Sequence, residues 1–119
     1  MRVLIAEDEK SVGIALANLV SHCQHEVVGV VASGLEAIKA YTIHQPDVVL
    51  MDYRMAKLNG STACRTILAR DPAARIILVS GWSSVIDLRD AGAIAILPKP
   101  VRLKHLEEAL NAAAQSSPK

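Results

Sequence analysis

VLIAEDE (residues 3–9) begins the chain with an apolar run that ends abruptly in three carboxylates. The same pattern returns twice, where VVLM (48–51) precedes Asp52 and AILP (95–98) precedes Lys99. Runs this short and this rich in Val, Ile and Leu are typical of strands buried on both faces of a parallel sheet. The carboxyl ends of such strands line the crevice where open α/β sheets bind ligands. The pattern therefore predicts that carboxylates from separate strands and one ammonium group meet around one point.

Crowded carboxylates repel one another and resist ionisation unless a cation lies among them. The acidic set of Glu7, Asp8 and Asp52 therefore predicts a divalent-metal site, with one carboxylate left to perform chemistry. Glu9 is assigned instead to the loop or the first helical turn, where the helix dipole favours an acidic side chain.

Length and composition indicate one compact domain over residues 1–119. Hydrophobic residues make up 51% of the chain, which is ample for a core, and the absence of Phe leaves that core to Val, Ile, Leu and Ala. The aromatic share of 3% also argues against a stacking surface for single-stranded nucleic acid.

Charge and cysteine usage exclude several other classes of function. The 13 basic and 12 acidic residues form no basic stripe for DNA or an anionic membrane. Cys23 and Cys64 lack metal-ligand spacing and are expected to be reduced thiols, buried or half-buried. No apolar stretch approaches the roughly 20 residues of a membrane span, and the chain enters a strand without a signal peptide. We expect a soluble, cytoplasmic domain.

Strand and helix patterns alternate five times along the chain. The expected strands are 2–6, 26–32, 47–51, 75–79 and 93–97, and the expected helices are 10–20, 34–44, 60–70, 82–91 and a last one after Pro100 with Leu103, Leu106, Leu110 and Ala113 on one face. Residues 115–119 are expected to form a frayed tail. At the second helix, Ser33 and Glu36 have the spacing of a capping box, in which each side chain satisfies the other's backbone amide.

This alternation predicts an α/β fold, a doubly wound, flavodoxin-like (βα)5 sandwich of three layers. Crossovers this short require a parallel sheet with right-handed connections and helices on both faces. The expected strand order is 2-1-3-4-5, with the switch point between the first and third strands. That order places Glu7, Asp8 and Asp52 side by side.

The residues at the strand ends together resemble the receiver domain of two-component response regulators. The matching set is Glu7-Asp8, Asp52, Ser80 and Lys99-Pro100, at the ends of the first, third, fourth and fifth strands. Each piece alone is a weak signal, but the whole set in this order is specific. The resemblance extends over essentially the whole chain.

The resemblance implies a role for each acidic residue. Asp52 would accept a phosphoryl group from a histidine kinase or a histidine phosphotransfer protein. Asp8 would ligate Mg²⁺ (with Mn²⁺ as an alternative) directly, and Glu7 directly or through water. Asp52 itself and the backbone carbonyl of Arg54 complete the implied ligands. Such a site suits Mg²⁺, which uses few carboxylates and retains waters and phosphate oxygens.

Lys99 and Ser80 would complete the chemistry of phosphoryl transfer. The reaction requires in-line positioning and neutralisation of charge on the equatorial oxygens, which the ammonium and the hydroxyl can supply beside the metal. Set between two prolines, Lys99 is expected to point inward, and the resemblance implies a cis peptide before Pro100. Ser80 has a second interpretation as a helix cap.

Four features depart from the family pattern. Ile96 stands where the family usually has an aromatic switch residue, and the segment 80–92 is about three residues shorter than the family pattern. Ala56 replaces a common proline, and the bulky Arg54 and Trp82 flank the expected phosphate position. We hypothesise that the switch is transmitted mainly through the loops at 80–84 and 54–59.

Three functions remain as hypotheses. The leading one is a phospho-accepting receiver that acts on a downstream protein or a fused effector domain, as a monomer or weak homodimer that contacts neither nucleic acid nor membrane. The second is a phosphate-independent interaction module with the same fold. The third is a phosphatase with an aspartyl nucleophile, although the DxD arrangement expected for such enzymes is missing after the first strand.

Overall fold

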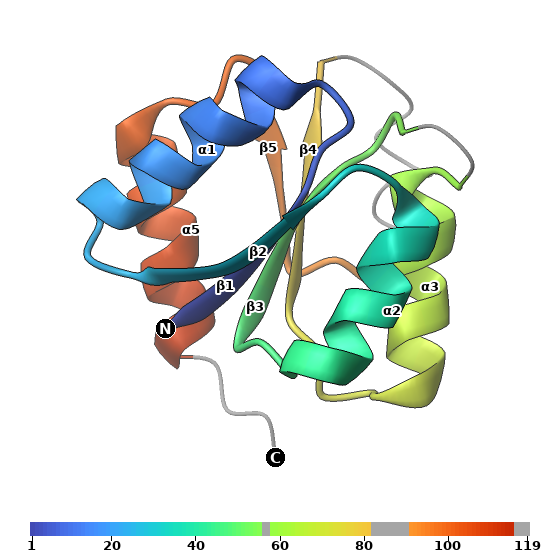
Figure 1. The fold of residues 1–119 in the computed structure, drawn as a ribbon. Helices are drawn as coiled ribbons and strands as arrows, with labels where there is room; N and C mark the ends of the chain where they lie inside the picture. Colours follow the sequence, from blue (N-terminus) through green and yellow to red (C-terminus); the bar gives the residue numbers. More distant parts are fainter. Residues whose placement is uncertain (56–57, 82–90, 116–119) are drawn as a thin grey trace.

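A five-stranded parallel sheet lies at the centre of the computed structural model, which describes residues 1–55, 58–81 and 91–115 (Figure 1). The strand order is β2-β1-β3-β4-β5, as predicted from the alternating pattern. The elements in chain order are β1 (Arg2–Ala6), α1 (Lys10–His22), β2 (Glu26–Val31), α2 (Gly34–His44), β3 (Val48–Asp52), α3 (Gly60–Arg70), β4 (Ile76–Ser80), β5 (Ala95–Pro98) and α5 (Leu103–Gln115).

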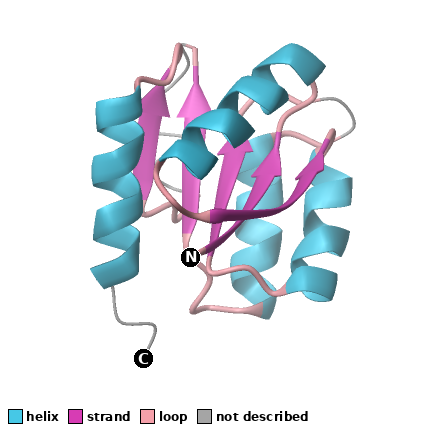
Figure 2. Cartoon of the chain, turned by 60° about the vertical axis from the view of Figure 1, so that its left-hand side comes forward, coloured by secondary structure: helices cyan, strands magenta, loops and turns pink. Residues whose placement is uncertain are grey.

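Helices cover both faces of the sheet, so the molecule has three layers (Figures 1 and 2). Helices α1 and α5 pack on one face, and α2 and α3 pack on the other. The fold is the predicted flavodoxin-like one, because the described helices cover both faces of a parallel sheet whose strand order is the expected one.

The three central strands supply most of the core. Every residue of β3 and β4 is buried, as is β1 after Arg2. Side chains alternate between a cluster under α2 and α3, which includes Leu4 and Met51, and one under α1 and α5, which includes Ile5 and Leu50. This confirms burial on both faces for the runs that form β1 and β3. The same expectation is wrong for the run at 95–98, because β5 lies at the edge of the sheet and only its Leu97 is buried. The other edge strand, β2, is also only partly buried.

Several predicted boundaries are wrong by one or two residues. Strands β3 and β4 each start and end one residue later than expected, so Asp52 and Ser80 are the last residues of their strands. Strand β5 begins at Ala95 instead of residue 93, and β2 ends one residue early. Hydrogen bonding to the neighbouring strand sets these limits, and hydrophobicity does not report it.

Two helices also differ from their predictions at the ends. Helix α1 continues to His22, two residues beyond the predicted end, and Gln115 belongs to α5 instead of a frayed tail. The predicted capping box at α2 forms only in part. The Ser33 hydroxyl accepts from the Glu36 amide, but the Glu36 carboxylate accepts from the amide of Ala32, one residue before the cap.

Some predictions fall on residues outside those that the structure describes. These are the helix at 82–91, almost entirely, together with Ala56, Trp82 and the tail beyond Gln115. Within the described part of the chain, no helix has both the length and the hydropathy that crossing a membrane requires. Both cysteines are free thiols, with Cys64 buried and Cys23 half-buried, as expected.

Candidate functional site

The pairing of the strands brings the charged strand ends together. Ala6 of β1 pairs with Met51 of β3, so the next residues, Glu7 and Asp52, lie side by side at the carboxyl edge of the sheet. On the other flank, Asp52 pairs with Val79 of β4. The predicted site therefore follows from parallel pairing in nearly equal register.

Ser80 and Lys99 reach the same edge from the next two strands. Ser80 pairs with Pro98 of β5, and the amide of Lys99 donates to the carbonyl of Ser80 over 3.0 Å. These contacts tie the end of β5 to the end of β4 beside Asp52. The peptide between Lys99 and Pro100 is cis, as the resemblance implied.

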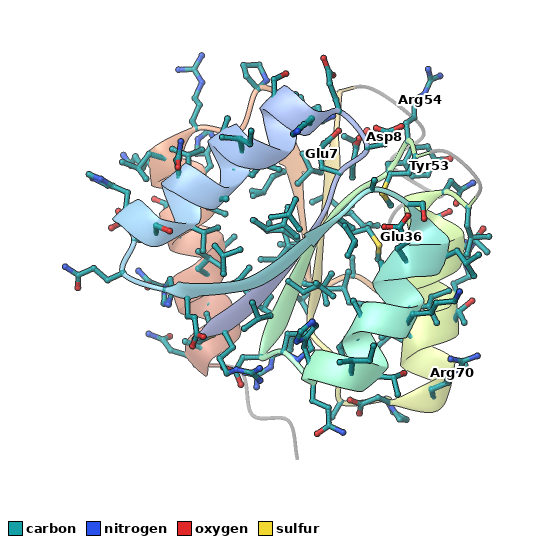
Figure 3. All side chains as sticks on the ribbon, viewed as in Figure 1. Glu7, Asp8, Glu36, Tyr53, Arg54 and Arg70 are labelled. Carbon is teal, nitrogen blue, oxygen red and sulfur yellow. The ribbon has the colours of Figure 1, made fainter. Side chains whose placement is uncertain are left out.

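Glu7, Asp8 and Asp52 form a compact cluster of carboxylates. Each offers an oxygen, and these oxygens all lie within 4.8 Å of one another. Glu7 and Asp52 are buried, and Asp8 is exposed at the mouth of the cluster. Figure 3 shows Glu7 and Asp8 close to Tyr53 and Arg54 at one end of the molecule. The spatial part of the prediction is confirmed for all three acidic residues.

The Lys99 side chain points inward and contacts both buried carboxylates. Its Nζ donates to Oδ2 of Asp52 over 3.0 Å and lies 3.3 Å from Oε1 of Glu7. Burial opposes the charge of the ammonium, but the hydrogen bond and the charge of Asp52, with a smaller contribution from Glu7, outweigh it and raise the pKa of Lys99. The lysine therefore stays charged beside Asp52.

Glu7 is held in an unfavourable setting for a carboxylate. Its Oε2 accepts from the Glu9 amide over 3.0 Å, whereas its buried Oε1 forms no hydrogen bond with any described residue. Burial raises the pKa of Glu7, the charge of Asp52 adds to this, and the Glu9 amide and Lys99 only partly offset it. Lys99 therefore pairs primarily with Asp52, and the Oε1 atom of Glu7 remains able to bind a cation.

A small cavity opens beside the acceptor carboxylate. It has a volume of about 160 Å³ and is lined by Asp52, Tyr53, Arg54, Ser80, Gly81 and Lys99. Ser80 is buried, and Arg54 is exposed at the rim. The cavity has room for a group of a few heavy atoms, and both Lys99 and Ser80 are among the residues that line it.

The donor set fits a small hard cation. The cluster supplies three carboxylates against one ammonium, and the buried Oε1 of Glu7 lies 3.3 Å from that ammonium without a hydrogen bond to any described residue. Oxygen ligands with one open, exposed side match Mg²⁺, which is bound through a few carboxylates and keeps several waters. The residues present therefore fit the metal that the resemblance implied.

Two glycines near the site were missed by the sequence reasoning. Gly60 begins α3 against the backbone of Asp52 and Tyr53, and Gly34 begins α2 against the carbonyl of Leu58. Each leaves no room for a side chain. Their position at the first residue of a helix was the available signal, since Gly has no advantage there beyond space.

Comparison with known proteins now identifies the family. The model of the response regulator receiver domain matches residues 3–111. The chain belongs to the response regulator receiver family. The match includes all four strand ends that form the site, from Glu7 to Lys99.

The receiver has relatives both as separate proteins and within longer ones. It is 33% identical over 118 residues to the chemotaxis protein CheY of Listeria monocytogenes, covering 97% of this chain and 99% of that protein. It is 37% identical over 114 residues to the transcriptional regulatory protein PdtaR of Mycobacterium tuberculosis, covering 94% of this chain but 56% of that protein.

Solved structures give the same picture of the receiver. The CheX–CheY–BeF3–Mg²⁺ complex from Borrelia burgdorferi superimposes with a TM-score of 0.91 at 25% identity, covering 98% of this chain and 90% of that one. The receiver domain from Clostridium thermocellum superimposes with a TM-score of 0.87 at 28% identity, covering 94% and 92% of the two chains.

Proposed function

We propose that this receiver accepts a phosphoryl group on Asp52 from a histidine kinase or a histidine phosphotransfer protein. One observation carries the proposal: the Lys99 ammonium donates to Asp52 over 3.0 Å within the cluster of three carboxylates, at the wall of a cavity of about 160 Å³. This arrangement joins a nucleophile, a fixed positive charge and a cation site at one point.

Asp52 is suited to act as the nucleophile without a general base. Its carboxylate accepts a hydrogen bond from the Lys99 ammonium and borders the cavity, where a phosphoryl group can approach. A carboxylate oxygen of Asp52 forms the new P–O bond while the P–N bond to the donor imidazole breaks. The electron pair of that bond leaves with the imidazole nitrogen, which takes up a proton.

The surrounding residues stabilise the charge of the transferring group. Lys99 and Ser80 line the cavity, so the ammonium would neutralise charge on the oxygens of the transferring group and the hydroxyl would donate to them. Glu7, Asp8, Asp52 and the carbonyl of Arg54 would hold Mg²⁺, which supplies a further positive contact to the phosphoryl oxygens. The Borrelia burgdorferi neighbour was crystallised with BeF3 and Mg²⁺, which supports this assignment.

Partners follow from the proposed chemistry. A phosphohistidine donor is the substrate, and the output is a change in binding to a downstream protein or a fused effector domain. Both arrangements occur among the relatives, since one spans almost the same length as this chain and another is a longer regulator. The proposal includes a cytoplasmic location, a single domain over residues 1–119 and a monomer or weak homodimer.

The decisive test is incubation with acetyl phosphate and Mg²⁺, followed by intact mass spectrometry. We expect one added phosphoryl group in the wild type and none in Asp52→Asn, while the matched control Asp47→Asn is phosphorylated like the wild type. Asp47 is an exposed aspartate at the opposite end of β3. No adduct at any Mg²⁺ concentration would favour the phosphate-independent interaction module instead.

A further inference from the structure

Helix α3 begins directly on the backbone of the acceptor residue. A Cβ atom at Gly60 would collide with the carbonyl oxygen of Asp52, and it would lie 2.8 Å from Cα of Tyr53 and 3.0 Å from the carbonyl carbon of Asp52. The amide of Gly60 also donates to the carbonyl of Tyr53 over 2.6 Å. The first residue of the helix is thus in contact with the peptide that joins Asp52 to Tyr53.

We propose that Gly60 is a positioning residue for the phosphoryl-accepting site. By having no side chain, it lets the start of α3 hold the peptide after Asp52 in the orientation that aims the carboxylate at the cavity. The same contact fixes the direction of the chain toward the carbonyl of Arg54. This inference rests on the proposed function, and it adds a residue that touches neither the phosphoryl group nor the metal.

The atoms that would collide with a side chain here have no freedom to move away on their own. They belong to the backbone, and the amide of Tyr53 donates a hydrogen bond to the carbonyl of Val79 in β4 over 2.8 Å. Relief of the collision must therefore displace either α3 or the segment from Asp52 onward. A displacement of about 1 Å at an active site is enough to slow a reaction strongly.

A second glycine provides a matched comparison. At Gly34, a Cβ atom would collide just as closely with a backbone carbonyl, but that carbonyl belongs to Leu58. Leu58 lies six residues beyond Asp52, outside the acceptor strand. Gly34→Ala and Gly60→Ala therefore impose a similar steric cost on the fold, and only the second imposes it on the acceptor peptide.

The experiment measures Mg²⁺ affinity by calorimetry and the rate of phosphorylation by acetyl phosphate, with thermal melting as the measure of folding. We expect both variants to lower the melting temperature. Gly60→Ala is expected to weaken Mg²⁺ binding about tenfold or more, as removal of other outer supports of metal ligands does. Gly34→Ala is expected to stay within about twofold of the wild type, because its collision is with Leu58 and not with the peptide that joins Asp52 to Tyr53.

A second variant keeps the inference testable if Gly60→Ala does not fold. Asn59 caps α3 by accepting from the amide of Thr62 over 2.9 Å, so Asn59→Ala loosens the start of α3 without adding an atom near Asp52. We expect weaker Mg²⁺ binding and slower phosphorylation than in Ile67→Val, which removes a buried methyl group further along the same helix. Equal values for these two variants would overturn the inference.

The remaining outcomes separate this inference from the proposed function. Equal losses of Mg²⁺ affinity in Gly34→Ala and Gly60→Ala would overturn the role of Gly60, whatever the phosphorylation rates. If the wild type binds Mg²⁺ without accepting a phosphoryl group, the proposed function fails and the Mg²⁺ affinities still decide the role of Gly60. If the wild type does neither, both proposals fail.

Discussion

At the amino ends of the strands, Arg2 donates from Nη1 to the carbonyls of His44 and Gln45 over 2.7 and 3.1 Å, and its amide donates to Asp47 over 2.7 Å. At the carboxyl ends, the buried Glu7 has an oxygen without a hydrogen bond to any described residue. At the amino ends, the charged groups named here have hydrogen-bond partners, whereas at the carboxyl ends three carboxylates crowd together.

The rest of the amino end follows the same rule. Arg75 donates to the carbonyl of Ala113 in the last turn of α5 over 2.6 Å, and the Tyr41 hydroxyl donates to Asp71 over 2.7 Å. Both contacts satisfy groups that helix ends and loops would otherwise leave to solvent. The comparison teaches that hydrogen bonds satisfy the polar groups at the amino ends of the strands, whereas carboxylates are left crowded at the carboxyl ends.

The largest expected effect is on chemistry at the carboxyl end. Lys99→Met removes the ammonium that contacts Asp52 and should slow phosphorylation by acetyl phosphate about 100-fold, because a fixed charge at the transferring group is lost. The rate of mass gain at saturating Mg²⁺ measures this. Lys104→Met, at an exposed position of α5, is the control. An unchanged rate in Lys99→Met would remove the lysine from the mechanism.

The next largest expected effect is a loss of stability at the amino ends of the strands. Arg75→Met should lower the free energy of unfolding by about 2 kcal/mol, because the end of α5 loses a charged hydrogen-bond donor. Urea denaturation measures the change, and Arg102→Met, at an exposed position, should stay within about 0.5 kcal/mol. The phosphorylation rate of Arg75→Met should equal that of the wild type. A slower rate would show that the two ends are not separate.

Added metal should stabilise the carboxyl end. Mg²⁺ at ten times its dissociation constant should raise the free energy of unfolding by about 1.4 kcal/mol, since it binds the folded chain only. EDTA should reverse the shift, and NaCl of equal ionic strength should not reproduce it. A shift that NaCl reproduces would indicate general screening instead of a site.

Neutralising the crowded cluster should also stabilise the metal-free protein. Glu7→Gln should raise the free energy of unfolding in EDTA by about 1 kcal/mol, because it removes a buried charge whose Oε1 lacks a hydrogen bond. The same variant should lose most of the stabilisation by Mg²⁺. Glu108→Gln, exposed on α5, should change neither quantity. A destabilised Glu7→Gln would mean that the contact with Lys99 outweighs the burial.

The smallest effect concerns the paired groups at the amino end. Burial, and then the hydrogen bond and charge of Asp71, raise the pKa of Tyr41 above its usual 10.0. A raised pKa in the folded state means that the stabilisation is complete below about pH 10 and is lost as the pH rises further. Tyr41→Phe should therefore cost about 0.5 kcal/mol at pH 7 and show a flatter loss of stability above pH 10 than the wild type. Parallel curves for the two proteins would contradict this.

Most of the fold and the members of the acidic cluster were predictable from local pattern. Continuous apolar runs identified the central strands, because a strand covered on both faces carries no polar alternation. The order of strands in a doubly wound sheet then placed Glu7 next to Asp52. Strand limits were less predictable, since Asp52 and Ser80 are polar residues that still pair within the sheet.

The support around the site was not predictable in the same way. Gly60 contacts Asp52 and Gly34 contacts Leu58 because the first residues of α3 and α2 both pack against the segment that follows β3. No spacing of residues in the sequence predicts that packing. The Glu36 carboxylate likewise accepts from the amide of Ala32, and not from the amide of Ser33 that the capping box predicted. Contacts between backbone segments distant in sequence depend on packing, which no local pattern encodes.

The sequence by itself determined which residues end the strands and therefore which chemical groups meet at the carboxyl edge. Only the tertiary structure decided that Lys99 pairs primarily with Asp52, that one oxygen of Glu7 is buried without a hydrogen bond, and that α3 contacts the acceptor peptide through Gly60. The physical reason is one of scale. Strand identity depends on hydrophobic pattern over a few residues, whereas hydrogen bonds and steric contacts depend on distances of tenths of an ångström between elements far apart in the chain.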